Sequence, residues 1–424
     1  MITARAFAGK HYAVYGLARS GLATVKALIA SGAKVTAWDD NEEARAKLPG
    51  GAQLLDLDNA DLSQFDSLVV TPGLPLNRHP IASRAREGGV EIIGDIELFA
   101  RARPELPPHK VVGITGTNGK STTTALVHHI LQTAGIPSAM GGNIGLPILA
   151  QDQLPEGGVY VLELSSYQLD LTQSLDCDVA VLLNITPDHL DRYDSFEAYA
   201  ASKNRLLLMQ SEEHKSVINW DAFIRGLIEP EKAGFNGIVP VSADAQMQWP
   251  ALRGPHNAEN AGAAIEACSW LGLLTAEQIE AGLRTFPGLP HRMERVAERG
   301  GVIFINDSKA TNPPAAASAL AAFPAIRWIC GGRPKGEDLD ECEPHFGHVR
   351  SAYTIGEAAE LFERLLKPHM PVKNCRELEV AVKAAADDAE AGDTVLLSPA
   401  CASFDQFKDF EERGDKFRAF VGAL

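Results

Sequence analysis

The feature that most constrains the fold is the stretch VVGITGTNGKSTTTALVHHIL, at residues 111–131. A short apolar run leads into a glycine-rich turn, and a helix-forming pattern begins directly after the turn. Glycine lets the backbone turn tightly and brings its N–H groups close to a ligand. A helix beginning at Lys120 would direct free N–H groups and the positive end of its dipole to the same place. The stretch therefore predicts a strand, a phosphate-binding loop and a helix.

The loop departs from the usual spacing G-x-x-x-x-G-K-[ST] of nucleotide-binding proteins. Counting back from Gly119 places Ile114 where the first glycine belongs. A plain glycine turn would also fit a junction between a strand and a helix. A lysine followed by hydroxyl residues favours a cradle for a nucleoside triphosphate, in which Ser121 or Thr122 offers a hydroxyl for Mg²⁺.

Apolar strands alternate with amphipathic helices along the whole chain. A proline-rich polar segment at residues 103–110 and the turn-rich segment FPGLPHRME at residues 286–294 interrupt this alternation. We therefore predict an α/β protein of three domains, at residues 1–106, 107–288 and 289–424. The first and last domains are expected to be Rossmann-like, and the central domain to be ATPase-like with a parallel or mixed sheet around the phosphate loop.

The composition excludes several classes of protein. The 424 residues carry 55 acids and 39 bases, a formal charge of −16, which argues against a nucleic-acid partner. No apolar run approaches the roughly 20 residues that span a bilayer, and the first residues lack the apolar segment of a signal peptide. Six scattered cysteines without a CxxC pair fit a reducing compartment. We expect a cytoplasmic monomer with no nucleic-acid or membrane partner.

Polar residues follow two further apolar strands. Glu163 ends the strand in LELSSYQL, and the carboxyl ends of parallel strands meet at one edge of a sheet. Glu163 would then face the phosphate loop and hold Mg²⁺ directly or through water. The next strand ends in NITPDHLDRY, where His189 could ligate a metal, although a single histidine there is more often a turn residue. The local pattern around Lys203 is typical of a solvated lysine on a helix.

Several motifs then occur in an order that resembles the Mur ligases, over nearly the whole chain: GITGTNGKSTT, GNIG, LELSSYQL, NITPDHLDRY, GPHNAENAGAA, GLPHRME, NDSKATNP and SPACASFDQFKDFEERG. The phosphate loop is shared with the folylpolyglutamate ligases, so it indicates only the superfamily. NDSKATNP and the last motif resemble the member that adds D-glutamate. The resemblance implies an ATP-driven amide ligase that joins D-glutamate to UDP-N-acetylmuramoyl-L-alanine through an acyl phosphate.

The resemblance also implies roles for single residues of the nucleotide and metal sites. The catalytic residues would be Lys120, Asn143, His189 and Lys203. Lys203 aligns with a lysine that is carbamylated in the family, so that a cation becomes an anion able to face a metal. Two Mg²⁺ sites would use Ser121, Glu163, His189 and Lys203. The ATP contacts would be Gly116, Thr117, Asn118, Gly119, Lys120, Ser121, Thr122, Asn257, Asn260, Arg292, Asp307 and Lys309.

The two remaining substrates would bind in the outer domains. By the same resemblance, the UDP part would contact Leu17, Ala18, Arg19, Ser20, Asp39, Asp40, Thr71 and Gly73. Asn143 would lie near the γ-phosphate and the substrate carboxylate. The D-glutamate site would include Thr311, Lys335, Ser403, Phe404 and Phe410. Residues 209–254 offer little to align, and no adenine contact is predicted there.

Three other interpretations stay open. A related amide ligase would differ in the first-domain pocket and the acceptor site, although the lack of a DNPR motif and the presence of SPACASFDQF favour D-glutamate. A nucleotide-dependent binding module would keep the phosphate loop without turnover, but it would need no second metal site. The segment GLARSGLA could indicate a dinucleotide-dependent oxidoreductase, but Ala18 replaces its middle glycine and residues 111–124 would stay unexplained.

Overall fold

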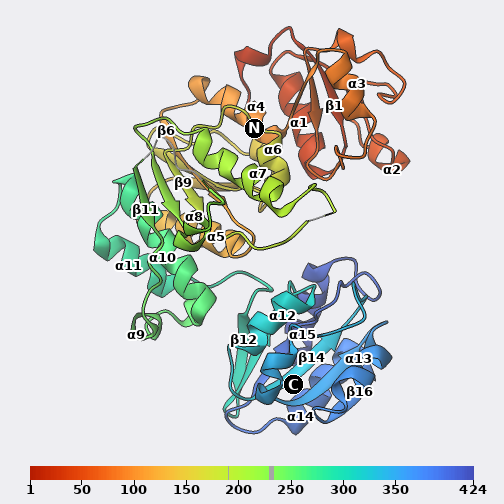
Figure 1. Cartoon of the computed structure of the whole chain (residues 1–424), viewed down its shortest axis with the longest axis vertical. Coiled ribbons are helices and arrows are strands. Elements are labelled where there is room, and N and C mark those ends of the chain that lie inside the picture. The colour runs from red at the N-terminus through yellow and green to blue at the C-terminus, as the bar shows by residue number, and fades with distance from the viewer. Residues whose placement is uncertain (190, 229–233) are drawn as a thin grey trace. The chain divides into compact units, whose positions relative to one another are not determined.

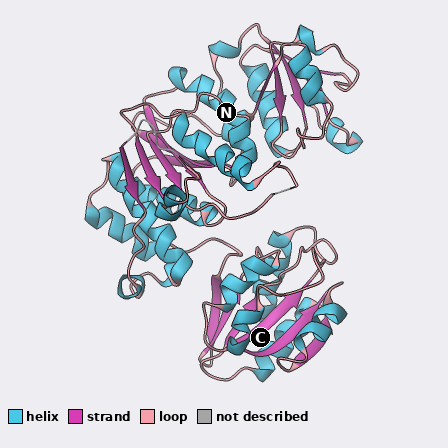
Figure 2. Cartoon of the chain, viewed as in Figure 1, coloured by secondary structure: helices cyan, strands magenta, loops and turns pink. Residues whose placement is uncertain are grey.

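The computed structural model describes residues 1–189, 191–228 and 234–424, which form two compact units (Figure 1). Unit 1 comprises Met1–Gln248 and Pro255–Phe286, and unit 2 comprises Trp249–Gly254 and Pro287–Leu424. Unit 1 holds two sheets and unit 2 holds one, and helices pack around each sheet (Figure 2). The predicted class, three α/β domains, is confirmed.

The first sheet of unit 1 is parallel and has the Rossmann-like strand order β3-β2-β1-β4-β5. Its strands are β1 (His11–Tyr15), β2 (Lys34–Trp38), β3 (Ala52–Leu54), β4 (Ser67–Val70) and β5 (Glu91–Ile93). Its helices are α1 (Arg19–Ala30), α2 (Glu42–Arg45), α3 (Ile81–Glu87) and α4 (Asp95–Ala102). A Cβ on Gly21 would lie 1.8 Å from the carbonyl oxygen of Gly16, so a glycine is required for α1 to approach the end of β1 this closely.

The second sheet of unit 1 has the order β11-β10-β9-β6-β8-β7, and all its described strand pairs are parallel. Its strands are β6 (His109–Thr115), β7 (Ser138–Gly142), β8 (Gly158–Glu163), β9 (Val179–Leu182), β10 (Lys215–Ile218) and β11 (Gly234–Gly237). Its helices are α5 (Lys120–Thr133), α6 (Ser166–Asp170), α7 (Phe196–Leu208), α8 (Trp220–Ile224), α9 (Ala243–Gln246), α10 (Pro255–Leu271) and α11 (Ala276–Thr285). Because these strands run the same way, the polar residues that follow them gather at one edge of the sheet.

The strands next to the phosphate loop are mostly apolar and are buried along most of their length. Every residue of β8 and β9 is buried, and so are the last five residues of β6. Such continuous apolar runs are expected where helices cover both faces of a parallel sheet. The strand pairing aligns the ends of three neighbouring strands at the site, because Ile114 of β6 and Gly142 of β7 both lie opposite Glu163 of β8.

The sheet of unit 2 has the order β12-β13-β17-β14-β15-β16 and is mixed, because β12 is antiparallel to β13. Gly300 and Gly301 join these two strands with φ of 57° and 78°, the backbone that a tight hairpin requires. The strands are β12 (Glu294–Arg299), β13 (Val302–Asn306), β14 (Ile326–Gly331), β15 (Val349–Ile355), β16 (Val372–Arg376) and β17 (Thr394–Leu397). The helices are α12 (Pro313–Leu320), α13 (Ala359–Leu366), α14 (Leu378–Asp388) and α15 (Phe410–Ala423).

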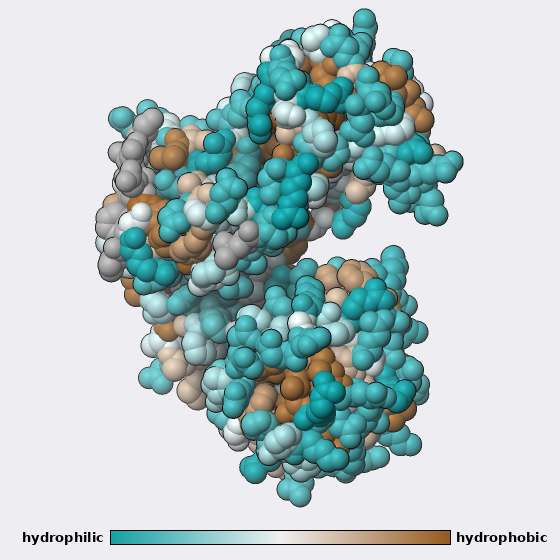
Figure 3. Space-filling model, turned by 45° about the vertical axis from the view of Figure 1, so that its right-hand side comes forward, coloured by the Kyte–Doolittle hydropathy of each residue, from teal (hydrophilic) through white to brown (hydrophobic). Residues whose placement is uncertain are grey.

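Hydrophilic side chains cover most of the visible face of the protein, with smaller apolar patches between them (Figure 3). Within the described part of the chain, no helix combines the length and the apolar character needed to cross a membrane. All six cysteines are free thiols, and Cys375 is the least buried of them. Burial raises the pKa of the Cys177 and Cys268 thiols to about 12, so these thiols stay protonated at neutral pH.

Candidate functional site

The predicted phosphate loop lies between β6 and α5, and α5 begins at Lys120 as predicted. Gly119 caps this helix with φ of 84°, in the left-handed region. A Cβ at Gly119 would lie 2.2 Å from Asn260 Oδ1, and a Cβ at Gly116 would lie 2.9 Å from the Cβ of Leu183. The backbone of the loop is therefore packed closely against α10 and the end of β9, where no side chain fits.

Asn184, the second residue after β9, holds the middle of the loop. Its carbonyl oxygen accepts from the N–H of Thr117 at 2.9 Å, and its Oδ1 accepts from the N–H of Asn118 at 2.8 Å. Its Nδ2 donates back to the carbonyl oxygen of Asn118 at 3.1 Å. The hydroxyl oxygen of Thr117 accepts from the N–H of Thr186 at 3.0 Å. Asn184 is not among the predicted site residues, although an asparagine just after the end of a buried strand is a usable signal.

Two lysines converge on one carbonyl group of the loop. Lys120 Nζ donates to the carbonyl oxygens of Gly116 and Thr117, both at 2.8 Å, and Lys203 Nζ donates to Gly116 at 2.9 Å. Lys203 is buried, and its Nζ lies 4.6 Å from the centre of the Tyr199 ring. Burial, with a smaller effect of Lys120, holds the pKa of Lys203 well below its usual value. The solvated position that the local sequence favours for Lys203 is therefore wrong.

Glu163 lies next to Asn143 at the end of β8. Its Oε1 accepts from Asn143 Nδ2 at 2.8 Å, and its carbonyl oxygen accepts from the N–H of Asn143 at 2.8 Å. Glu163 is 2 % exposed, and its Oε2 is buried without a hydrogen-bond partner among the described residues. An unpaired carboxylate oxygen in a buried position is what a bound cation would satisfy.

His189 lies in the exposed turn after β9, with φ of 55°. Its Nε2 lies 3.5 Å from Asp188 Oδ2, and its ring lies 5.0 Å from the ring of Tyr167. Burial lowers the pKa of His189, which favours the neutral imidazole that a metal needs. Among the described residues, no group of three or more His, Cys, Asp or Glu side chains is placed to hold a metal ion. A Mg²⁺ ion here would therefore take much of its coordination from phosphate and water, as is usual for this ion.

The asparagines of α10 lie beside the loop. Asn260 is 6 % exposed, and its Oδ1 accepts from the hydroxyl of Thr123 on α5 at 3.3 Å. Its Nδ2 donates to Asn257 Oδ1 at 3.2 Å. The predicted ATP residues of unit 1 are therefore contributed by one loop and two helices that pack together.

The glycine turn of the first sheet brings the predicted UDP residues together. The N–H of Leu17 donates to Asp39 Oδ2 at 2.6 Å, and a Cβ on Gly16 would lie 2.2 Å from the hydroxyl oxygen of Thr71. Helix α1 begins at Arg19, and the side chain of its cap residue, Ala18, makes no capping bond. This side chain therefore leaves the first N–H groups of α1, including that of Ser20, uncapped. An anion site at a helix N-terminus requires such uncapped N–H groups.

Asp40 lies in a different environment from Asp39. Its Oδ1 accepts from the hydroxyl of Tyr15 at 2.8 Å, and the same hydroxyl lies 3.0 Å from Asp58 Oδ2. His79 Nε2 lies 3.3 Å from this hydroxyl. Burial and the two carboxylates raise the pKa of Tyr15, so the phenol stays protonated and links the ends of β1 and β2 to neighbouring loops.

Arg192 fastens the loop after β4 to the His189 turn. Its guanidinium donates to the carbonyl oxygens of Leu74 at 2.8 Å and Gly73 at 3.3 Å, and it lies 4.3 Å from the centre of the Tyr167 ring. Arg78 donates in the opposite direction, to the carbonyl oxygen of Asp191 at 2.8 Å. We call residues 72–78 and 188–193, without Leu190, the loop clasp. No local sequence pattern singles out Arg192, because its partners are backbone groups far away in the chain.

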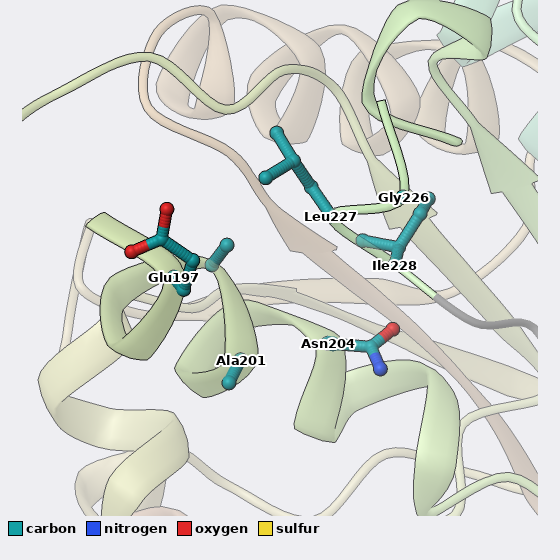
Figure 4. Close-up of a pocket in the computed structure, with 7 residues that line it drawn as sticks. Glu197, Ala201, Asn204, Gly226, Leu227 and Ile228 are labelled. Atoms are coloured by element: carbon teal, nitrogen blue, oxygen red, sulfur yellow. The ribbon is translucent and has the colours of Figure 1, made fainter. Parts of the chain in front are cut away.

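Several cavities of unit 1 lie outside the phosphate loop, and two of them border helices α6 and α7. The larger, about 530 Å³, borders the loop clasp and is lined by Leu74, Tyr167 and Arg192 among others. The smaller, about 210 Å³, lies between α7 and residues 226–228 (Figure 4). None of the predicted site residues lines the smaller cavity, which therefore does not belong to the candidate site.

In unit 2, Asp307 follows β13 and is buried. Its Oδ2 accepts from the hydroxyl of Ser398 at 2.9 Å, and its Oδ1 accepts from the N–H of Met293 at 3.1 Å. Burial raises the pKa of Asp307 to about 7, and the positive charge of Arg292 opposes this shift weakly. Lys309 Nζ lies 3.9 Å from the centre of the Phe410 ring.

The predicted acceptor residues also lie in unit 2. Lys335 Nζ lies 3.4 Å from the hydroxyl oxygen of Thr311, which brings the loops after β14 and β13 together. Ser403 is 2 % exposed, whereas Phe404 beside it is 63 % exposed. Phe410 is the first residue of α15. The exposed ring of Phe404, next to the buried Ser403, is free to contact a ligand.

The chain belongs to the Mur ligase family. Three family models match it in succession: the MurD-like N-terminal domain over residues 10–94, the Mur ligase middle domain over 114–249 and the Mur ligase glutamate ligase domain over 291–401. The chain is 59 % identical to the UDP-N-acetylmuramoylalanine--D-glutamate ligase of Novosphingobium aromaticivorans, across 100 % of the chain and 97 % of that protein. The enzyme of the same name from Zymomonas mobilis is 54 % identical, with 100 % of both chains covered.

Solved structures support the same fold. The UDP-N-acetylmuramate-alanine ligase MurC of Thermotoga maritima matches with a TM-score of 0.59 and 17 % identity, over 98 % of this chain and 99 % of that one. The MurF ligase of Thermotoga maritima in complex with ADP matches with a TM-score of 0.59 and 17 % identity, over 98 % and 96 %. At this identity the likeness concerns the fold.

Proposed function

We propose that the protein joins the amino group of D-glutamate to the carboxylate of UDP-N-acetylmuramoyl-L-alanine and converts ATP to ADP and phosphate. The observation that carries this proposal is the phosphate loop, where Lys120 and Lys203 meet at the carbonyl oxygen of Gly116. Lys120 supplies the positive charge that a bound phosphate chain would neutralise, and its closeness favours the neutral form of the buried Lys203 amine. Relatives that bear this enzyme's name along their full length support the choice of substrates.

The chemistry follows from the inertness of a carboxylate towards an amine, since the carboxylate has no leaving group. A carboxylate oxygen attacks the γ-phosphorus of ATP, and ADP leaves. The amine of D-glutamate then attacks the acyl carbon and loses a proton, and phosphate leaves as the amide forms. Lys120 would offset the charge that develops on the transferred phosphoryl group, and Asn143 would orient the reacting carboxylate beside Glu163.

The residues present suit Mg²⁺. The unpaired Oε2 of Glu163 and the hydroxyl of Ser121 would bind it at the phosphates, and His189 would serve a second ion. When bound, the ions would neutralise phosphate charge during transfer. Lys203 would contribute as a carbamate: its low pKa favours the neutral amine, the form that reacts with CO₂.

The remaining predicted residues divide the substrates among the domains, for which we keep the boundaries 1–106, 107–288 and 289–424. The turn at Leu17–Ser20, with Asp39 and Thr71, would take the UDP part of the substrate. The loops of unit 2 that carry Thr311 and Lys335 would take D-glutamate, and Asp307 and Lys309 would contact ATP. We propose a cytoplasmic monomer.

An assay of ADP release tests the proposal. Purified protein is supplied with UDP-N-acetylmuramoyl-L-alanine, ATP and Mg²⁺, and with D-glutamate, L-glutamate, L-alanine or diaminopimelate as the acceptor. We expect release only with D-glutamate, with the amide product identified by mass spectrometry. Lys120→Ala should abolish turnover while the circular dichroism spectrum is retained. Turnover with L-alanine or diaminopimelate alone would refute the substrate assignment, and near-normal turnover of Lys120→Ala would refute the role of the loop.

A further inference from the structure

Arg413, on the first turns of α15, is a fully buried cation that the proposed reaction does not use. Its side chain is 0 % exposed. Its Nε donates to the hydroxyl of Ser308 at 2.9 Å, and one terminal nitrogen donates to the carbonyl oxygens of Ser308 at 2.8 Å and Cys401 at 3.1 Å. The other terminal nitrogen donates to the carbonyl oxygen of Ala402 at 3.3 Å. All four of these acceptors are neutral.

Burying a guanidinium this deeply is costly. Removing a cation from water carries a penalty of several kcal/mol, and a buried arginine is usually paired with a carboxylate. Burial lowers the pKa of Arg413 to about 10, with Cys401, Asp405 and Asp307 acting weakly against the shift. The group therefore remains a cation at neutral pH. An apolar side chain would fill the same space at less cost if packing were its only role.

The acceptors of Arg413 lie on the loops that carry the predicted acceptor site. Ser308 follows β13, in the loop that leads to Thr311. Cys401 and Ala402 follow β17, directly before Ser403. The strands β13, β17 and β14 are neighbours in the sheet and run parallel, so their loops emerge at one edge.

The loop after β14 joins the same arrangement. Arg333 and Ala402 exchange two backbone hydrogen bonds, at 2.9 and 3.0 Å. The carbonyl oxygen of Ala402 therefore receives both the N–H of Arg333 and the guanidinium of Arg413. A Cβ on Gly332 would lie 2.3 Å from that oxygen, so the three loops are in close contact around it. Lys335 stands only two residues beyond Arg333.

We propose that Arg413 is a positioning residue for the acceptor amino acid: its planar fork holds the loops after β13 and β17 in register, and its charge lies beneath the loops that carry the predicted dicarboxylate site. This inference rests on the proposed function. Fixed backbone carbonyls satisfy the guanidinium without cancelling its charge, so the charge remains to attract an anion. A charge within the protein is also screened by salt less than a charge at its surface.

The geometry distinguishes arginine from lysine at this position. Lysine would keep the charge, but its single nitrogen cannot span all four acceptors that the three guanidinium nitrogens reach on the two loops. Arg413→Lys should therefore loosen the loops, whereas Arg413→Met should also remove the charge. Lys416, an exposed cation on the same helix, offers a matched control, Lys416→Met.

The test measures KM for each substrate in the wild type and in these variants. We expect Arg413→Lys to raise KM for D-glutamate at least ten-fold, while KM for the UDP substrate changes less than two-fold and KM for ATP, whose predicted contacts Asp307 and Lys309 flank Ser308, changes less than KM for D-glutamate. Arg413→Met should raise KM for D-glutamate further than Arg413→Lys does, because it also removes the charge, and this difference should persist as the salt concentration rises. Formation of the acyl phosphate without D-glutamate, trapped with hydroxylamine, should stay near the wild-type rate. Lys416→Met should resemble the wild type throughout.

Several results would overturn the proposal. One is an unchanged KM for D-glutamate in Arg413→Lys, and another is an equal loss for all three substrates, which would indicate general structural damage. If the arginine variants fail to fold, Ser308→Ala replaces them in the test, because it removes a single hydrogen bond of Arg413. A selective rise in KM for D-glutamate in this variant supports the proposal, and loss of folding here as well refutes it. A wild type that forms acyl phosphate but does not use D-glutamate would instead refute the proposed function.

Discussion

Gly119→Ala tests the phosphate loop most directly, because the structure opposes a side chain there in two independent ways. The residue has φ of 84°, and an L-residue in the left-handed region costs about 1–2 kcal/mol. The new Cβ would lie 2.2 Å from Asn260 Oδ1 and 3.3 Å from Leu183 Cδ1. The first distance is well inside van der Waals contact, so the amide of Asn260 or the loop itself must move.

Gly135→Ala separates these two effects. Gly135 follows the same helix, with φ of 79°, but a Cβ there has no heavy atom within 4 Å. Both variants should lose about 1–2 kcal/mol of backbone stability. This corresponds to a fall of about 2–8 °C in melting temperature for a domain of this size. Only Gly119→Ala should weaken nucleotide binding, because only there does the loop have to move.

Calorimetric titration with ADP and Mg²⁺ measures the difference. We expect the Kd of Gly119→Ala to rise at least ten-fold, which corresponds to about 1.4 kcal/mol. Gly135→Ala should bind as the wild type does. Tight binding by Gly119→Ala, or equal weakening in both variants, would show that the close packing of the loop against Asn260 does not determine nucleotide affinity.

Three further perturbations test other parts of the site. Lys203→Ala should lower kcat at least 100-fold and be partly restored by a short carboxylic acid, and failure of this rescue would argue against a carbamate. Arg192→Met should raise the Kd of the UDP substrate about five-fold in titration calorimetry, since it releases the loop clasp, and an unchanged Kd would contradict this role. For Asp307 the folded pKa of about 7 exceeds the usual 3.8, so between these pH values the folded state keeps a proton that the unfolded state has lost. Stability should therefore fall by up to about 1.4 kcal/mol per pH unit through this window and level off above it, and Asp307→Asn should show no such fall in melting temperature.

The parts of the site that the sequence predicts are those with a local pattern. The strand, glycine loop and helix at residues 111–131 can be recognised from one continuous stretch of sequence. The rule that ligands bind at the carboxyl ends of parallel strands then places Glu163 beside them. The burial of Lys203 has no local pattern, and only the family resemblance indicates it. The antiparallel β12 was not predicted either, although Gly300 and Gly301 mark its turn.

The arginines that organise the loops lie inside two of the quoted motifs, but their role could not be predicted from the sequence. Arg192 and Arg413 bind backbone carbonyl oxygens, which every residue carries and which therefore leave no trace in the sequence. Their partners also lie far away along the chain. Contacts of this kind appear only when the fold brings distant segments together.

The segment Trp249–Gly254 has a practical consequence for anyone who divides this protein. It groups with unit 2, although the residues on both sides of it belong to unit 1, and Trp249 and Leu252 within it are buried. The polypeptide thus passes from one unit to the other three times, after residues 248, 254 and 286. A recombinant fragment that starts at Pro287 would lack the segment Trp249–Gly254, which belongs to unit 2. A fragment that stops at Phe286 would contain this segment without the unit against which it packs. Expression of either fragment alone should therefore yield poorly soluble material.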